Sequence, residues 1–236
     1  MIILFPSDYF DVKQIDPDYV AEYDAVCKIP EFKTVLFNYD EFVSDGKIKL
    51  YPKGYYSSDC IYRGWMLTPE QYKSLYGFLF NKGITLINSP EEYNACHLFP
   101  NVRATLGLYT PRSLYFDNPV DIDWDLVNRT FSRFLVKDYV KSVKGFKFPD
   151  YFETPVNHEE LNGRIAEFVE LRGGLFTGGI VLKEYVDLKK YDGATNEYRA
   201  FYLFGQLLSL CRNSNQPDSC GFVPLDFVNR FANLQM

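Results

Sequence analysis

The sequence has few of the residues that build metal centres and nucleophilic triads. It contains only two histidines, His97 and His158, and its five cysteines are scattered without a Cys-x-x-Cys pair. This inventory argues against a zinc site and against a histidine-based triad. An odd number of unpatterned cysteines favours reduced thiols, as in a cytosolic protein.

Long apolar runs are also missing. No run approaches the roughly 20 apolar residues that a membrane helix needs. The opening segment MIILFP is shorter than a signal-peptide core and has no basic region before it. A net charge of −6 and a pI ≈ 5.1 give no global preference for nucleic acid. The sequence therefore predicts a soluble, cytoplasmic protein whose partners include neither nucleic acid nor a membrane.

What the chain does have is apolar and aromatic content. Of its 236 residues, 47% are hydrophobic and 18% are aromatic, which excludes a disordered or low-complexity chain. A chain of this length buries a sizeable core, either as one unit or as two lobes.

The first half alternates strand and helix patterns. Two helix starts are well signed, Thr68-Pro69-Glu70-Gln71 and Ser89-Pro90-Glu91-Glu92, each with a capping residue, a proline and a glutamate or glutamine at the third helical position. A further helix is expected over 19–27. Strands are expected over 2–5, 34–38, 47–51, 59–67 and 84–87. This rhythm predicts an α/β amino-terminal lobe over residues 1–110.

After residue 110 the pattern changes. Helices are expected over 123–131, 158–171 and 222–236, and strands over 134–140 and 180–186. A hairpin is expected from 198–204 and 207–212, with Gly205 in the first position of a type II′ turn. The strands of this half are separated by helices, but the last two form an antiparallel pair. The sequence therefore predicts an α+β module over residues 111–236.

Three of these expected strand segments carry charges where a buried strand should be apolar. Burying an ionised side chain without a partner costs several kcal/mol, on the order of the stability of a small domain. Such charges are more simply explained if they gather around a charged ligand, and cations beside a glycine-containing turn at 142–145 suit a polyphosphate. The charged positions are Lys137, Lys141, Lys183, Glu184, Glu197, Arg199 and Arg212.

These segments, in this order, resemble the ATP-grasp superfamily, and within it the clade named for two arginines and a lysine. FLVKDYVKSVKG is similar to the strand that supplies a phosphate-contacting lysine and continues into a lid loop. IVLKEYVDL is similar to the hinge strand beside the adenine, and NEYRAFYLFGQLLSLCRNS to a hairpin that carries two arginines. The segment from Arg63 to Asn101 is similar to the lobe before the ATP-binding module. The resemblance implies an ATP-grasp-like α+β fold.

The resemblance also implies roles for individual residues. Lys137 would neutralise phosphates, Lys141 would assist at the lid, and Gly145 would let the lid backbone approach phosphate oxygens. Arg199 and Arg212 would be the catalytic pair that holds the γ-phosphate and a substrate carboxylate. The remaining residues of the implied ATP site lie along the hinge strand: Lys183, Glu184, Tyr185, Val186 and Asp187, with Asp187 toward the ribose.

The implied activity is ATP-dependent ligation of a carboxylate to an amine or thiol through an acylphosphate, on an amino-acid or peptide substrate. ATP and Mg²⁺ are the implied cofactors. The family's metal ligands lie on strands that follow a helix like 222–236, and only Asp218 and Asp226 are acidic there. The metal ligands are therefore not located, and the sequence is expected to be either a shortened form or a variant without that site. An ATP-binding assembly factor without turnover is the alternative function.

Simpler interpretations remain open for several charges. Lys137 and Lys141, four apart in one expected strand, also fit a solvated edge. Glu184 also fits an ion pair with Lys183 or with a neighbour across the sheet, and Glu197 fits an ion pair with Arg199. Arg63, beside Gly64 and Trp65, fits an arginine that packs on aromatic rings better than a substrate contact.

Overall fold

The computed structural model describes residues 1–143, 148–191, 193–203, 205–213 and 225–232. The chain divides into two compact units, Met1–His97 and Leu98–Met236. The sequence pattern predicts the boundary after residue 110, whereas the contacts separate the chain after His97. Residues 98–110 therefore belong with the second unit.

The first unit is built on a five-stranded sheet in the order β3-β2-β1-β4-β5. All neighbouring strands are parallel except β3, which is antiparallel to β2. The strands predicted for this lobe are all present, and most end within about two residues of the predicted bounds. They are β1 (Ile2–Pro6), β2 (Lys33–Phe37), β3 (Leu50–Tyr51), β4 (Ser58–Tyr62) and β5 (Ile84–Leu86).

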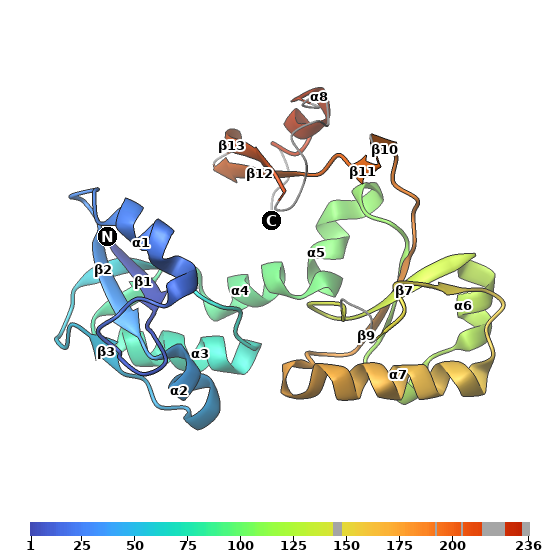
Figure 1. The fold of residues 1–236 in the computed structure, drawn as a ribbon, viewed down its shortest axis with the longest axis horizontal. Coiled ribbons are helices and arrows are strands. Elements are labelled where there is room, and N and C mark those ends of the chain that lie inside the picture. The colour runs from blue at the N-terminus through green and yellow to red at the C-terminus, as the bar shows by residue number, and fades with distance from the viewer. Residues whose placement is uncertain (144–147, 192, 204, 214–224, 233–236) are drawn as a thin grey trace. The chain divides into compact units, whose positions relative to one another are not determined.

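Helices cover both faces of this sheet (Figure 1). Ile3, Phe5 and Leu36 pack against α1, and the alternate strand residues pack against α3. This alternation is why β1 is buried on both faces and reads as a continuous apolar run. The helices are η1 (Pro17–Tyr19), α1 (Val20–Val26), α2 (Tyr39–Asp45), α3 (Pro69–Phe80) and α4 (Pro90–His97).

The predicted start of α3 is confirmed by a reciprocal capping box. The Thr68 hydroxyl accepts from the Gln71 amide at 3.3 Å, and the Gln71 side chain accepts from the Thr68 amide at 2.9 Å. Ser89 and Glu92 form the same exchange ahead of α4, at 3.1 Å and 2.7 Å. Both helices therefore begin where the sequence signals them.

Replacing the Thr68 cap should loosen α3 without unfolding the unit. We expect Thr68→Ala to cost about 1 kcal/mol, because one amide of the first turn loses its acceptor. Hydrogen exchange in the first turn of α3 should then become about fivefold faster. Thr85→Ala, at an exposed position on β5, is the control and should leave α3 unchanged. Equal exchange rates in Thr68→Ala and the wild type would contradict the capping role.

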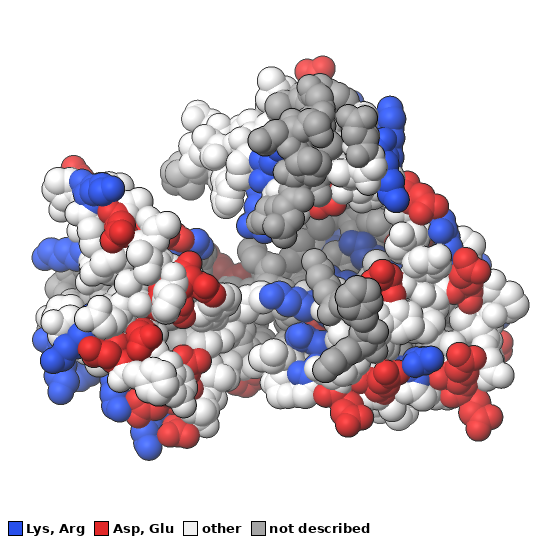
Figure 2. Space-filling model, viewed as in Figure 1, with Lys and Arg blue, Asp and Glu red and all other residues white. Residues whose placement is uncertain are grey.

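The second unit is built on a four-stranded antiparallel sheet in the order β6-β9-β7-β8. Its strands are β6 (Ser113–Phe116), β7 (Arg133–Asp138), β8 (Phe152–Glu153) and β9 (Ile180–Glu184). One face packs on α6 (Trp124–Thr130) and α7 (His158–Arg172) around the buried Phe134 and Phe168. Acidic groups lie along the outer side of α7 (Figure 2). The helices over 123–131 and 158–171 were both predicted.

The other face of this sheet carries Lys137 of β7 and Lys183 of β9. Along β7, Phe134, Val136 and Asp138 are buried, while the intervening residues are partly exposed. Short helical segments before and between these strands complete this part of the unit: α5 (Phe99–Leu106), η2 (Gly107–Tyr109), η3 (Pro119–Asp121) and η4 (Gly173–Leu175). Together these elements confirm the predicted α+β class.

The carboxy-terminal part contains the predicted hairpin. Its strands are β12 (Tyr198–Leu203) and β13 (Gln206–Arg212), which follow the short pair β10 (Lys190–Tyr191) and β11 (Ala194–Thr195). Leu203 pairs with Gln206, so Gly205 occupies the second loop position, with φ +74°. The prediction of a type II′ turn with Gly205 first is therefore wrong, because that turn needs the positive φ one residue earlier.

The predicted closing helix is shorter than expected within the described residues. It is α8 (Leu225–Asn229), and residues 230–232 are turns. The Tyr202 hydroxyl on β12 donates to the Val228 carbonyl at 2.6 Å, which ties the hairpin to α8. The rest of the predicted helix lies outside the described residues. In the part of the chain that the structure describes, no helix combines the length and the apolar character needed to cross a bilayer.

Candidate functional site

Lys137 and Lys183 lie on the same face of the four-stranded sheet. In the β7–β9 register, Lys137 is opposite Val181 and Lys183 is opposite Leu135. Directly opposite residues of an antiparallel pair point to one face, so the two lysines are diagonal neighbours. Their ammonium groups both lie over the ring of Phe99 from α5, at 5.7 Å for Lys137 and 4.5 Å for Lys183. We call Lys137, Lys183 and Phe99 the lysine face.

The electrostatics of this face suit an anion. Burial lowers the pKa of the Lys183 ammonium below its ordinary value of 10.5, and the like charge of Lys137 lowers it further. Both effects disfavour the charged form of Lys183 in the free protein. An anion bound here would relieve the repulsion between the two ammonium groups, so the face is arranged to favour negative charge.

The hinge segment Glu184–Asp187 continues directly from Lys183. The Glu184 amide donates to the Arg112 carbonyl and the Tyr185 amide donates to the Arg133 carbonyl, both at 2.9 Å. These two amides therefore already have acceptors within the protein. The Val186 amide has no hydrogen bond within the described residues, and the residue is 46% exposed. The Asp187 amide likewise has no hydrogen bond within the described residues, so the amides of Val186 and Asp187 are the ones left to meet a ligand.

The two carboxylates of the hinge segment are held by arginines. Arg112 binds Glu184 through two nitrogens, at 2.6 Å and 3.1 Å, and this hydrogen bond lowers the pKa of the Glu184 carboxyl. The sequence left Lys183 or a neighbour across the sheet as the alternative partner of Glu184, and Arg112, directly before β6, is such a neighbour. Asp187 accepts from Arg133 at 2.5 Å. A contact between Asp187 and a ribose stays a prediction, and the ribose hydroxyls would have to compete with Arg133 for this carboxylate.

A pocket of ≈ 520 Å³ adjoins the hinge segment. Glu184 and Val186 form one side of it, and residues 107–112 with Arg103 form the other. The pocket is open, and its lining mixes backbone, apolar side chains and two guanidinium groups. A space of this size, next to a free amide, suits a flat heteroaromatic group.

One of the predicted phosphate contacts, Lys141, lies outside strand β7. Strand β7 ends at Asp138, so Lys141 lies beyond the strand and not in it. There the buried Asp138 carboxylate accepts from the amides of Val140 and Lys141, at 2.7 Å and 2.5 Å, and turns the chain. The expectation that Lys137 and Lys141 point to one face of one strand is therefore wrong. Gly145 lies outside the described residues.

Arg199 and Arg212 both lie on the β12–β13 hairpin. Arg199 donates to the Asn213 side-chain oxygen at 2.9 Å, and the Asn213 side-chain amide donates to Glu197 at 3.0 Å. The Asn213 amide thus bridges the pair that the sequence suggested as a direct ion pair. Arg212 lies over the Tyr198 ring at 5.4 Å and donates to Asn196 at 3.4 Å. Their role toward a ligand stays a prediction.

Sequence reasoning missed three contributors to this region. Phe99 lies in the segment that the resemblance assigned to the preceding lobe, and Arg112 comes from a segment without a recognised pattern. Asp138 is fully buried and binds Arg172 of α7 at 2.7 Å, where Arg172 is 12% exposed. An aspartate at the end of an apolar strand was a usable signal, because such a carboxylate needs a buried cation or several amides.

Arg63 has a structural partner in the first unit. It binds Glu22 through two nitrogens at 2.5 Å and 2.7 Å, which holds its pKa above the ordinary value. The predicted packing of Arg63 on aromatic rings is thus replaced by an ion pair with α1. The neighbouring Trp65 donates to Asp16 at 2.9 Å.

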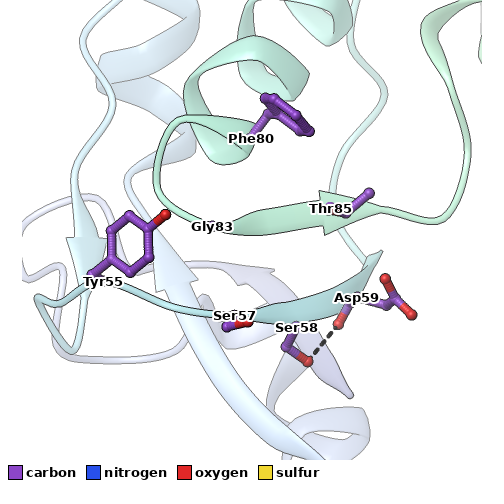
Figure 3. A pocket seen from close by; sticks show the side chains of 7 residues that line it. All are labelled: Tyr55, Ser57, Ser58, Asp59, Phe80, Gly83 and Thr85. Carbon is purple, nitrogen blue, oxygen red and sulfur yellow. Dashed lines mark hydrogen bonds between the residues drawn. The ribbon is translucent and has the colours of Figure 1, made fainter.

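The first unit also has a pocket, of ≈ 530 Å³, on the outer part of β4 and β5 (Figure 3). Asp59 and Thr85 are register partners and leave neighbouring strands on the same side. The seven lining residues, all within the described chain, include this one carboxylate and no cation. This pocket therefore does not suit a phosphate, and the lysine face is the better candidate for one. The lining residues are Tyr55, Ser57, Ser58, Asp59, Phe80, Gly83 and Thr85.

Comparisons with known proteins agree with this architecture. No family model matches the sequence, and no curated protein does. Among solved structures, the RimK domain ATP-grasp protein from Sphaerobacter thermophilus is similar, with a TM-score of 0.53 and 12% identity over 99% of this chain and 82% of that one. The D-alanine–D-alanine ligase from Bacillus anthracis has a TM-score of 0.51 and 13% identity over 98% and 74%. For the macrocyclase MdnC from Microcystis aeruginosa the values are 0.50 and 14% over 99% and 82%. The chain has the ATP-grasp fold.

Proposed function

We propose that the protein binds ATP and acts as an ATP-dependent ligase, which joins a carboxylate to an amine or thiol. The observation that carries the proposal is the placement of Lys137 and Lys183 on one face of the sheet, with the hinge segment continuing from Lys183. Two cations beside a segment with a free amide match the two ends of a nucleotide, its phosphates and its base. The ATP-grasp fold supports the same assignment.

In this proposal each residue has a defined task. Lys137 and Lys183 bind phosphate oxygens, and the Val186 amide with the hinge carbonyls meets the adenine edge. Arg199 and Arg212 present guanidinium forks to the γ-phosphate and the substrate carboxylate. Because phosphoryl transfer depends chiefly on positioning and on charge neutralisation, these cations are the groups that the reaction needs from the chain.

The proposed chemistry has two steps. A substrate carboxylate oxygen attacks the γ-phosphorus, the bond to the β–γ bridging oxygen breaks, and ADP leaves with an acylphosphate formed. The amine then attacks the acyl carbon, inorganic phosphate leaves, and the amine loses a proton. The substrate class is an amino acid or a peptide that bears a free carboxylate.

Magnesium would assist the phosphates in such a reaction, but its protein ligands are not identified. Within the described residues, no group of three or more His, Cys, Asp or Glu side chains could hold a metal ion. No step above is therefore assigned to a protein-bound metal.

Binding and turnover test the proposal separately. Titration calorimetry with ATP and Mg²⁺ should give saturable binding that GTP does not match. ADP release should then rise when a mixture of amino acids and short peptides is added. Failure to bind ATP would overturn the proposal. Binding of ATP without ADP release, whether or not carboxylates are added, would replace the ligase with an ATP-binding assembly factor.

A further inference from the structure

Phe99 is the aromatic member of the lysine face. It is the first residue of α5, and its amide donates to the Tyr139 carbonyl at 2.8 Å, just after β7. Its ring lies 4.5 Å from the Lys183 ammonium and 5.7 Å from that of Lys137, and its centroid is 6.2 Å from the Tyr115 ring on β6. One ring thus contacts side chains from all three strands of this part of the sheet.

Lys183 has no hydrogen bond or ion pair within the described residues. The nearest hinge carboxylate, Glu184, is already bound by Arg112. Among the described residues, Lys137 on β7 is the charged group that acts on Lys183. The Phe99 ring beside Lys183 also lies near Tyr115 on β6, on which Arg103 of α5 acts. Burial and the like charge of Lys137 both disfavour the protonated form of Lys183. Among the described contacts, the ring of Phe99 is the one that favours this form.

An aromatic ring differs from a carboxylate in one respect that matters here. A carboxylate would neutralise the lysines and compete with phosphate for them. The face of a ring attracts cations through its quadrupole and carries no net charge, so Lys183 stays available to an anion. A phosphate can therefore approach the Lys183 ammonium without first displacing a negative partner from it.

We infer that Phe99 is a positioning residue, which holds the Lys183 ammonium on the lysine face in a charged and accessible state for a phosphate group. The inference rests on the proposed function, because the phosphate is that of the bound nucleotide. Phe99 acts through Lys183 and does not itself touch the reacting atoms. It holds the Lys183 ammonium in position in the free protein, before the nucleotide binds.

The test replaces the ring and keeps the apolar volume. Phe99→Leu removes the quadrupole and leaves an apolar side chain, whereas Phe99→Tyr keeps a ring and is the matched control. We expect Phe99→Leu to bind ATP about three- to tenfold more weakly, and Phe99→Tyr to bind within about twofold of the wild type. Denaturation midpoints for the variants show whether each remains folded.

A second readout does not depend on ATP. Lysines labelled with ¹³C-methyl groups can be titrated by NMR, with the Lys183 signal assigned from its loss in Lys183→Arg. In Phe99→Leu the pKa of Lys183 should fall below its wild-type value, and in Phe99→Tyr it should stay. A merely structural role would change the denaturation midpoint and leave this pKa in place.

The two readouts separate the possible failures. If ATP does not bind the wild type, the proposed function fails, and the NMR titration still decides whether Phe99 supports the Lys183 charge. If ATP binds, and Phe99→Leu changes neither its affinity nor the Lys183 pKa, the inference is wrong. If Phe99→Leu lowers both the ATP affinity and the pKa of Lys183, and Phe99→Tyr leaves both at their wild-type values, the inference holds.

Discussion

Asp138→Ala should lower the free energy of unfolding of the second unit by about 3–5 kcal/mol. Asp138 is fully buried at the end of β7, and its carboxylate accepts from Arg172 at 2.7 Å and from two turn amides. Removing it leaves the Arg172 guanidinium, only 12% exposed, without its counter-charge. The loss exceeds that of an ordinary hydrogen bond because the remaining charge stays buried.

Each unit has one tryptophan, which makes this loss measurable in the intact chain. Trp124 is buried on α6 in the second unit, and Trp65 lies in the first. In a Trp65→Phe background, urea unfolding followed by tryptophan fluorescence reports the second unit alone. The midpoint should fall strongly for Asp138→Ala.

Two further variants show whether the buried charge is the cause. Glu167→Ala removes a carboxylate from the half-exposed pair with Arg164 on the same helix, and should cost less than about 1 kcal/mol. Asp138→Ala combined with Arg172→Met removes both charges and should recover part of the stability. If Asp138→Ala and Glu167→Ala are equally mild, the buried pair does not hold this end of the sheet.

The parts of the fold that were predictable from the sequence carry local signals. Thr68 and Ser89 signal their helices through side chains only three residues apart, and the apolar run of β1 signals a strand. α5 lacks such a signal, since its N-cap residue Leu98 offers no side-chain acceptor. The helix was missed for that reason, and with it Phe99.

Residues of the site could be placed from the sequence only where the strand pattern alone determines their position. Lys137 and Lys183 could be placed because each lies inside a clear strand. Lys141 was misplaced because the strand ends early, at a carboxylate whose main partner, Arg172, lies 34 residues away. The partners of Glu184 and Arg63 are likewise 72 and 41 residues distant, and no periodicity in one sequence encodes such pairings.

Lys183→Ala should weaken ATP binding by about 10- to 100-fold. A charged hydrogen bond to phosphate contributes on the order of 1.5–3 kcal/mol, and each 1.4 kcal/mol is about a factor of ten in affinity. The matched control is Lys189→Ala, which removes an exposed cation that lies over Tyr191 at 4.9 Å, beyond the hinge segment. Titration calorimetry should find that control within about twofold of the wild type.

The pH dependence of binding gives this prediction a signature that loss of stability cannot mimic. Lys183 binds phosphate in its protonated form, and its pKa lies below the ordinary 10.5. As the pH rises through that lowered pKa the charge is lost, so ATP affinity should decline earlier on the alkaline side than an ordinary lysine would allow. Lys183→Arg keeps its charge throughout and should remove the decline. If Lys183→Ala binds ATP as tightly as Lys189→Ala does, the phosphates bind elsewhere and the lysine face is not the nucleotide site.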